Sequence, residues 1–334
     1  MELLAPVGNL AGVAPTLDAG ADAIYVGLKD DTNARRFAGI NFSPAELLQA
    51  AELCQQRSKK LYVAINTYPG PNQESRWHSA IDAAAEAQIS AVIMADPGLL
   101  DYAQRRHPQL ERHLSVQASA ANLPSLRLYH QHFGITRAVL PRVMSVQQIT
   151  RISADSPVEL EVFASGSLCV MAEGRCQLST WFSGQSPNSG GACSPAERVR
   201  WVEADSGREA WLGDYLLERT PQGEAGGYPT VCKGRYHIDS QGDGSQHAIC
   251  SPCGLSTLPL LPQLAKAGVS ALKLEGRQRS PAYSQAITKV WRQAIDQHQQ
   301  RGSSYRMDPA WQQQLRQLAE GQTLTTGPYM EGWQ

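Results

Sequence analysis

Short apolar runs recur along the chain, each preceded by a small-residue helix ending and followed by a polar residue. The segments AGADAIYVG (19–27), AQISAVIMAD (87–96) and AGVSALKLEG (267–276) share this form. An unbroken apolar run is typical of a strand that is covered on both faces, as in a parallel sheet. Five more runs of this kind bring the predicted strands to eight, at residues 2–5, 61–66, 114–119, 138–142 and 160–164.

Helical patterns lie between the predicted strands. The clearest is SPAELLQAAELCQQRSK, in which Ser43 is a predicted N-cap, Pro44 takes the first helical position and Glu46 completes a capping box. Comparable patterns cover residues 75–88, 96–106, 122–133, 145–153 and 257–268. This alternation predicts an α/β fold, a (β/α)8 barrel of the TIM-barrel type. A doubly wound open sheet is the alternative, which periodicity does not exclude.

The alternation stops after the seventh strand, in a segment rich in turn residues such as SGQSPNSGGACSP. We therefore predict a barrel domain made of residues 1–165 and 257–300, an insertion at residues 166–256, and a C-terminal extension at residues 301–334. In a barrel, this insertion would rise from the C-terminal face, where barrel enzymes carry their active site.

The composition of the chain limits the classes of protein to which it can belong. With 334 residues, 42% of them hydrophobic, the chain can bury one large core or two ordinary ones. Its N-terminus lacks the features of a signal peptide, and no apolar stretch approaches the ~20 residues of a membrane span. A formal net charge of −1 predicts no general attraction to nucleic acid or to anionic lipid. We expect a cytoplasmic protein whose cysteines stay reduced.

Six of the seven cysteines lie in the predicted insertion. Four of them follow the spacing Cys169-x6-Cys176-x16-Cys193-x38-Cys232, which fits neither a zinc ribbon nor a ferredoxin. The other two form the CxxC of CSPCG, and a single CxxC is weak evidence for a metal site. The clustering favours four thiolate ligands, and spacing alone leaves zinc and an iron–sulfur cluster both open.

The stretch EVFASGSLCVMAEGRCQLS (161–179) resembles the signature of the collagenase-like U-type peptidase family, E-x-F-x-x-G-x-x-C-x4-G-x-C-x-x-S. The similarity extends over nearly the whole chain and includes GLKDDTNARRFAGINF, SVQASAAN, VLPRV, GACSPA and GYPTVCKGRY. The matching positions of the signature are Glu161, Phe163, Gly166, Cys169, Gly174, Cys176 and Ser179.

The resemblance implies an enzyme that hydroxylates the ring of a ubiquinone precursor without O2, with prephenate as the hydroxyl donor. It also implies a homologous partner chain, in a heterodimer, and one [4Fe–4S] cluster in each chain. By their places in the matching motifs, the cluster ligands would be Cys169, Cys176, Cys193 and Cys232. The remaining pair, Cys250 and Cys253, matches no motif of the family.

Three other functions stay open. Relatives in the family hydroxylate RNA bases, but the near-neutral charge and the lack of a basic, aromatic-rich stripe disfavour nucleic acid as a partner. The family name suggests a peptidase, yet no nucleophile–base pair or HExxH helix is recognisable in the sequence. A non-catalytic subunit, with the chemistry in its partner, is the third alternative.

Polar side chains at predicted strand ends are the candidates for binding and catalysis. Prephenate carries two carboxylates, and arginine binds carboxylates with a two-pronged geometry. Arginines at strand ends or in rim loops are Arg142, Arg277, Arg35 and Arg36. We predict Glu275 as the acid–base or orienting group, with Arg277 as its catalytic neighbour. The predicted substrate-binding residues are Arg142, Asn66 and Gln117.

Overall fold

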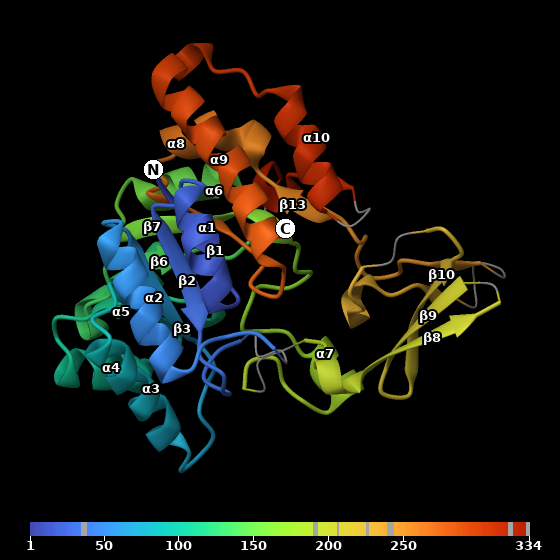
Figure 1. Cartoon of the computed structure of the whole chain (residues 1–334), viewed down its shortest axis with the longest axis horizontal. Helices are drawn as coiled ribbons and strands as arrows, with labels where there is room; N and C mark the ends of the chain where they lie inside the picture. Colours follow the sequence, from blue (N-terminus) through green and yellow to red (C-terminus); the bar gives the residue numbers. More distant parts are fainter. Residues whose placement is uncertain are drawn as a thin grey trace.

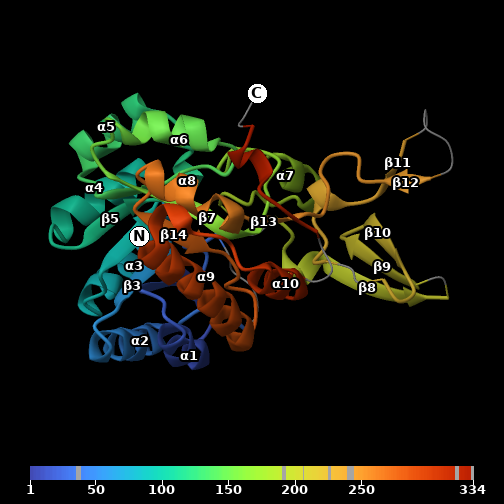
Figure 2. The ribbon, with the colours of Figure 1, turned by 90° about the horizontal axis from the view of Figure 1, so that it is seen from above.

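The computed structural model describes residues 1–34, 39–189, 193–205, 207–224, 227–238, 244–319 and 323–331. Within these residues the chain forms a barrel, an elongated insertion beside it, and a C-terminal segment packed where the two meet (Figures 1 and 2). Arg35 and Arg36, two of the candidate arginines, lie outside the described residues.

Eight parallel strands form the barrel. They are β1 (Glu2–Pro6), β2 (Ala23–Gly27), β3 (Lys60–Ile65), β4 (Ala91–Met94), β5 (Glu111–Leu114), β6 (Arg137–Val139), β7 (Glu159–Ser167) and β14 (Ala271–Leu274). Consecutive strands pair in parallel, and β14 pairs with both β7 and β1, which closes the sheet. The predicted (β/α)8 barrel is confirmed, and the open-sheet alternative is wrong.

Helices cover the outside of the barrel (Figure 2). In chain order they are α1 (Val13–Asp18), α2 (Pro44–Gln56), α3 (Glu74–Glu86), α4 (Pro97–Arg106), α5 (Leu123–Phe133), α6 (Val146–Ser153), α8 (Leu261–Lys266) and α9 (Pro281–Arg301), with short 3-10 turns at η1 (Leu10–Gly12) and η5 (Leu258–Leu260). The predicted capping box of α2 is present: the Ser43 hydroxyl accepts from the Glu46 amide at 3.3 Å, and the Glu46 carboxylate accepts from the Ser43 amide at 2.8 Å.

One strand is displaced from its prediction. We expected a strand at residues 114–119, but β5 ends at Leu114 and the chain turns into the 3-10 helix η2 (Val116–Ala118). The Ser115 hydroxyl caps this turn by accepting from the Gln117 amide, and Ser119 adopts a left-handed conformation with φ of 52°. Short polar side chains that bond to nearby backbone favour turns over strands, which explains the difference.

The insertion leaves the barrel at the end of β7 and returns at β13 (Gly254–Ser256), which pairs antiparallel with β7. It begins with a loop and α7 (Leu178–Ser183), then forms a three-stranded antiparallel sheet that stands away from the barrel (Figure 1). Its other elements are η3 (Ala196–Arg198), β8 (Val199–Ala204), β9 (Gly207–Leu212), β10 (Tyr215–Pro221), η4 (Val231–Lys233), β11 (Tyr236–His237) and β12 (Ser245–Gln246).

The C-terminal segment extends the barrel sheet. After η6 (Gly302–Ser304) and α10 (Pro309–Leu318), the strand β15 (Leu324–Thr325) pairs in parallel with β13. The turn η7 (Gly327–Tyr329) then places the fully buried Tyr329 against β7, where its hydroxyl donates to the Phe163 carbonyl at 2.9 Å. This segment therefore closes against the strand from which the insertion leaves.

The interior of the barrel is unusually polar, since barrels of this type are commonly filled by branched apolar side chains. At the N-terminal ends of the strands, the Arg137 guanidinium contacts Glu2 at 2.5 Å and Glu159 at 2.7 Å. Further inside, the Lys273 ammonium contacts Glu161 at 2.7 Å, and Glu161 is fully buried. Charged pairs thus follow one another through the barrel interior, from the N-terminal ends of the strands toward the C-terminal face.

Candidate active site

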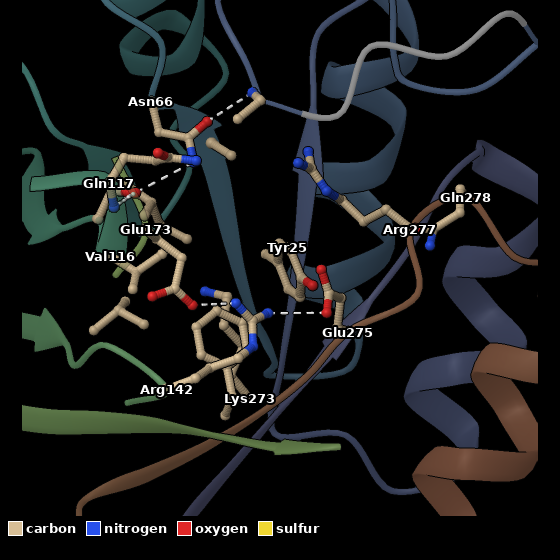
Figure 3. A pocket seen from close by; sticks show the side chains of 16 residues that line it. Tyr25, Asn66, Val116, Gln117, Arg142, Glu173, Lys273, Glu275, Arg277 and Gln278 are labelled. Carbon is tan, nitrogen blue, oxygen red and sulfur yellow. Dashed lines mark hydrogen bonds and ion pairs between the residues drawn. The ribbon is translucent and has the colours of Figure 1, made fainter. Parts of the chain in front are cut away.

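A cavity of about 60 Å³ lies at the C-terminal mouth of the barrel (Figure 3). The five predicted residues other than cysteines all line it: Asn66, Gln117, Arg142, Glu275 and Arg277. Each follows the carboxyl end of a strand, namely β3, β5, β6 or β14. Because the carboxyl ends of parallel barrel strands meet at one rim, residues far apart in sequence converge there.

Arg142 is the centre of the cavity's charge network. Its Nη2 lies 2.9 Å from Oε2 of Glu275, and its Nη1 contacts the Glu173 carboxylate (Figure 3). The guanidinium stacks 3.5 Å from the centre of the Phe163 ring. Burial by itself would lower the pKa of Arg142, but the two carboxylates outweigh it and raise that pKa above its ordinary value. Arg142 therefore carries its charge permanently and already binds two carboxylates.

Glu275 is held by the backbone as well as by Arg142. Its Oε2 also accepts a hydrogen bond from the Ser167 amide at 3.0 Å. Gly166 makes this approach possible: its φ is +141°, and a Cβ added there would lie 2.5 Å from Cβ of Glu275. The glycine of the signature thus allows the end of β7 to pass against Glu275, which fixes the carboxylate at the cavity wall.

Arg277 lies on the other side of the mouth. It is buried, its Nη1 donates to Oδ1 of Asn33 at 3.3 Å, and its guanidinium lies 5.4 Å from the centre of the Tyr25 ring. Arg142 and Arg277, which follow different strands, thus line the same cavity. Their catalytic and binding roles remain predictions.

The two amides differ in what they offer a ligand. Asn66 uses both ends of its amide within the protein: Oδ1 accepts from the Ala34 amide at 2.9 Å, and Nδ2 donates to the Ser115 hydroxyl at 3.2 Å. Gln117 Oε1, in contrast, is buried and has no hydrogen-bond partner among the described residues. The same holds for Arg142 Nε and Glu173 Oε2. Two acceptors and one donor therefore line the cavity, which suits a ligand with hydroxyl and carboxylate groups.

Sequence reasoning missed two charged residues of the cavity, Lys273 and Glu173. Burial lowers the pKa of Lys273, although Glu161 opposes the shift, and its ammonium lies 4.4 Å from the centre of the Tyr25 ring. A signal was present in the sequence: Lys273 interrupts the apolar run of ALKLEG with a charge. Glu173 carried no such signal, because it lies in a loop whose position depends on the rest of the fold.

The loop of the signature, which follows β7, contacts the rim of the cavity. Gly174 has φ of +82°, and a Cβ there would lie 2.0 Å from the carbonyl oxygen of Gln117. The Ser119 hydroxyl donates to the Glu173 carbonyl, and Asn188 Nδ2 donates to the Gly174 carbonyl at 3.1 Å. The loop is thus docked on the rim through close backbone contacts, and it places Cys169 3.8 Å from Arg142 Nη1.

The four predicted cluster ligands are all in the described part of the chain and partly accessible. Burial raises the pKa of the Cys232 thiol, and the neighbouring Cys193 and Cys250 thiols add to that rise, so these side chains lie near one another. Among the described residues, however, no three Cys, His, Asp or Glu side chains are grouped closely enough to hold a metal ion. The donors suit an iron–sulfur cluster, but they are not assembled as one ligand set, and the ligand assignment stays a prediction.

The second cysteine pair lies at the base of the insertion. Cys253 Sγ is 3.1 Å from the hydroxyl of Thr323, beside the C-terminal strand. Burial raises the pKa of the Cys250 thiol, although Lys233 opposes the shift. The Cys250 thiol also adds to the raised pKa of Cys232, one of the predicted ligands.

The fold and the site define a class of protein: a closed (β/α)8 barrel with a charged mouth and a cysteine-bearing loop docked on its rim. Residues 8–332 match the model of peptidase family U32, and the chain belongs to that family. No helix in the described ranges has the length and apolar character that crossing a membrane requires.

Proteins that are similar to this chain are named for different activities. The chain is 27% identical to tRNA hydroxylation protein P1 of Bacillus subtilis over 331 residues. This match covers 99% of this chain and 71% of that protein. It is 30% identical to tRNA hydroxylation protein P of Escherichia coli, over 88% of this chain and 68% of the relative. A collagenase of Porphyromonas gingivalis is 29% identical, over 88% of this chain and 65% of its own length. These relatives are thus longer than the part that this chain matches.

Proposed function

We propose that this chain is the UbiU-like, cluster-binding subunit of an O2-independent hydroxylase of the ubiquinone-precursor ring. In this proposal it acts in a heterodimer with a UbiV homologue, and prephenate is the hydroxyl donor. The observation that carries the proposal is the barrel-mouth cavity, which Arg142, Arg277, Lys273 and Glu275 line together. Arg142 also lies 3.8 Å from Cys169 of the signature. Relatives named for tRNA hydroxylation support the reaction type.

The cavity's chemistry suits a dicarboxylate that bears a hydroxyl group. Arg142 and Arg277 are buried cations, and charge-assisted hydrogen bonds to carboxylates are stronger where water is excluded. Glu173 already contacts Arg142, so a donor carboxylate would take its place on the guanidinium. Gln117 Oε1 supplies an acceptor for a donor hydroxyl.

The reaction is balanced without an outside oxidant. The acceptor ring exchanges a C–H bond for a C–OH bond, and the donor exchanges its C–OH bond for a C–H bond. Two electrons therefore pass, in net terms, from the ring to the donor. A bound [4Fe–4S] cluster would supply one-electron transfer, because four cysteine ligands leave no iron open for a substrate. In this scheme Glu275 orients the reactants or moves a proton, and Lys273, with its lowered pKa, exchanges a proton at Nζ.

Hydroxylation of a tRNA base is the second candidate, because relatives that are up to 30% identical are named for it. The net charge of −1 gives the chain no general attraction to a polyanion, since phosphate contacts depend on clustered Lys and Arg. We therefore favour the quinone precursor.

One experiment separates the two functions. The chain and its UbiV homologue are prepared together under argon, and iron and acid-labile sulfide are measured. We expect about four irons in each chain. The complex is then given prephenate labelled with 18O in its hydroxyl group, together with either a ubiquinone precursor or unmodified tRNA. Label in the quinone precursor is the expected result, whereas label in tRNA alone would establish the second function.

Two further outcomes test the cofactor and the partner. Stoichiometric zinc without sulfide would contradict the cluster, and separate elution of the two chains at micromolar concentration would contradict the heterodimer. Replacing both Cys250 and Cys253 by serine should leave the iron content unchanged, because these residues match no family motif. Loss of more than about half the iron in that variant would show that the ligand assignment is wrong.

A further inference from the structure

A second, larger cavity adjoins the first. Its volume is about 450 Å³, and it lies where the barrel rim, the insertion and the C-terminal segment meet. Glu275 and Gln278 line both cavities, so the two share a wall. Along the long axis of the molecule, α10 lies between the barrel and the three-stranded sheet of the insertion (Figures 1 and 2). The volume falls within the range of small-molecule pockets, which is about 300–1,000 Å³.

Polar groups in this cavity are connected by a chain of hydrogen bonds. The Lys233 ammonium donates to the Ser167 hydroxyl at 2.9 Å, and the Ser167 amide donates to Glu275 at 3.0 Å. Cys193 also lines the cavity, on the side of the insertion. The polar part of the second cavity is therefore continuous with the wall of the first.

Polar side chains such as Arg279, Thr230 and Ser194 also line the cavity. An aliphatic part of the lining comes from separate elements: β13, α9, α10, β15 and the loop after β2. The residues are Leu255, Ile287, Leu315, Leu318, Leu324 and Ile40. Ile40, Leu318 and Leu324 are only half-buried, so part of their apolar surface still contacts solvent. A ligand that covers this surface gains hydrophobic free energy in proportion to the apolar area removed from water.

We propose that the second cavity binds an apolar tail whose attached aromatic ring lies at Glu275, beside the polar cavity. The inference rests on the proposed function, because it assigns the small cavity to the hydroxyl donor and the larger one to a lipid-tailed acceptor ring. The arrangement gives the two reactants adjoining cavities that share the Glu275 carboxylate. It also places Cys193 near the acceptor rather than the donor.

Affinity that depends on tail length is the expected consequence. Each methylene that leaves water for the cavity should tighten binding about fourfold, until the apolar part is filled. The probes are phenol, butylphenol and octylphenol, each used below its micelle concentration with the heterodimer under argon. Octylphenol should bind on the order of a hundredfold more tightly than butylphenol, or less if the cavity fills earlier. Equal affinities for phenol and octylphenol would overturn the proposal.

Two variants test the location. Leu318→Gln places an amide in the apolar lining and should weaken octylphenol binding about tenfold while leaving phenol binding unchanged. Ala319→Trp fills the cavity from the end of α10 and should remove the difference between butylphenol and octylphenol. The matched control is Leu53→Gln, a half-buried leucine near the end of α2 and outside the cavity, which should behave as the unmodified protein. Unchanged tail dependence in both cavity variants would overturn the proposal.

The outcomes distinguish a failure of the apolar-tail proposal from a failure of the proposed function. Tail-dependent binding without hydroxylation of the ubiquinone precursor would reject the proposed function and leave the apolar site standing. Hydroxylation without tail dependence would reject the apolar site alone. If the chain binds octylphenol by itself but the heterodimer does not, the partner chain covers the cavity, and the assignment to a lipid tail is overturned.

Discussion

Replacing Arg142 by alanine would leave two buried carboxylates without their shared counter-charge. The side chain of Arg142 is 3% exposed, and those of its partners Glu173 and Glu275 are 6% and 10% exposed. Removing one partner of a buried ion pair costs about 3–5 kcal/mol, since the remaining charge is desolvated and unpaired. Loss of the contact with the Phe163 ring adds about 1 kcal/mol. We expect the free energy of unfolding to fall by about 4–6 kcal/mol at neutral pH.

A second substitution identifies the cause of this loss. Without Arg142, the buried carboxylates of Glu173 and Glu275 lose the cation that they share. Adding Glu173→Gln should restore part of the stability, because it removes one of the unpaired charges.

Urea unfolding followed by circular dichroism measures these differences. The control is Arg76→Ala, which breaks an ion pair of 2.7 Å with Asp31 at a side chain that is 57% exposed. Exposed pairs contribute at most about 1 kcal/mol, so this variant should unfold almost as the unmodified protein does. If Arg142→Ala loses no more stability than Arg76→Ala, or if adding Glu173→Gln restores none of the loss, the buried charge network described here is wrong.

Three shorter predictions concern other parts of the fold. Burial raises the pKa of Glu2, but Arg137 outweighs it and lowers that pKa from 4.5 to about 2. The ion pair therefore stabilises the fold above pH 4.5, and this stabilisation is lost as the pH falls toward 2. Glu2→Gln should flatten the acid side of a stability–pH profile. Gly174→Ala should displace the signature loop and increase its hydrogen exchange, because the added Cβ would lie 2.0 Å from the Gln117 carbonyl oxygen; unchanged exchange would contradict the docked loop. Tyr329→Phe should cost about 1 kcal/mol in urea unfolding, for one buried hydrogen bond, and no loss would show that the C-terminal turn is not anchored there.

The sequence by itself determined the alternation of strands and helices. Apolar runs and helix caps are local signals, so the eight barrel strands and the capping box at Ser43 could be predicted without knowing any tertiary contact. The positions of Arg142 and Glu275 followed from the same logic, because a polar residue at the end of a buried parallel strand must lie at the rim of the sheet. The strand prediction was wrong at residues 114–119, where short polar side chains, those of Ser115 and Ser119, compete for the hydrogen bonds of the backbone.

Tertiary structure alone decided which of these residues touch. Arg142 and Glu275 are 133 positions apart, and they meet only because β14 pairs with β7 and closes the barrel. Glu173 reaches the cavity from a loop that has no periodic pattern, held by contacts with the rim. Lys273 is tolerated within a buried strand only because Glu161, on the neighbouring strand β7, supplies its counter-charge. A sequence pattern records which residues are buried, whereas the pairing of buried charges depends on the register between strands, which no local pattern contains.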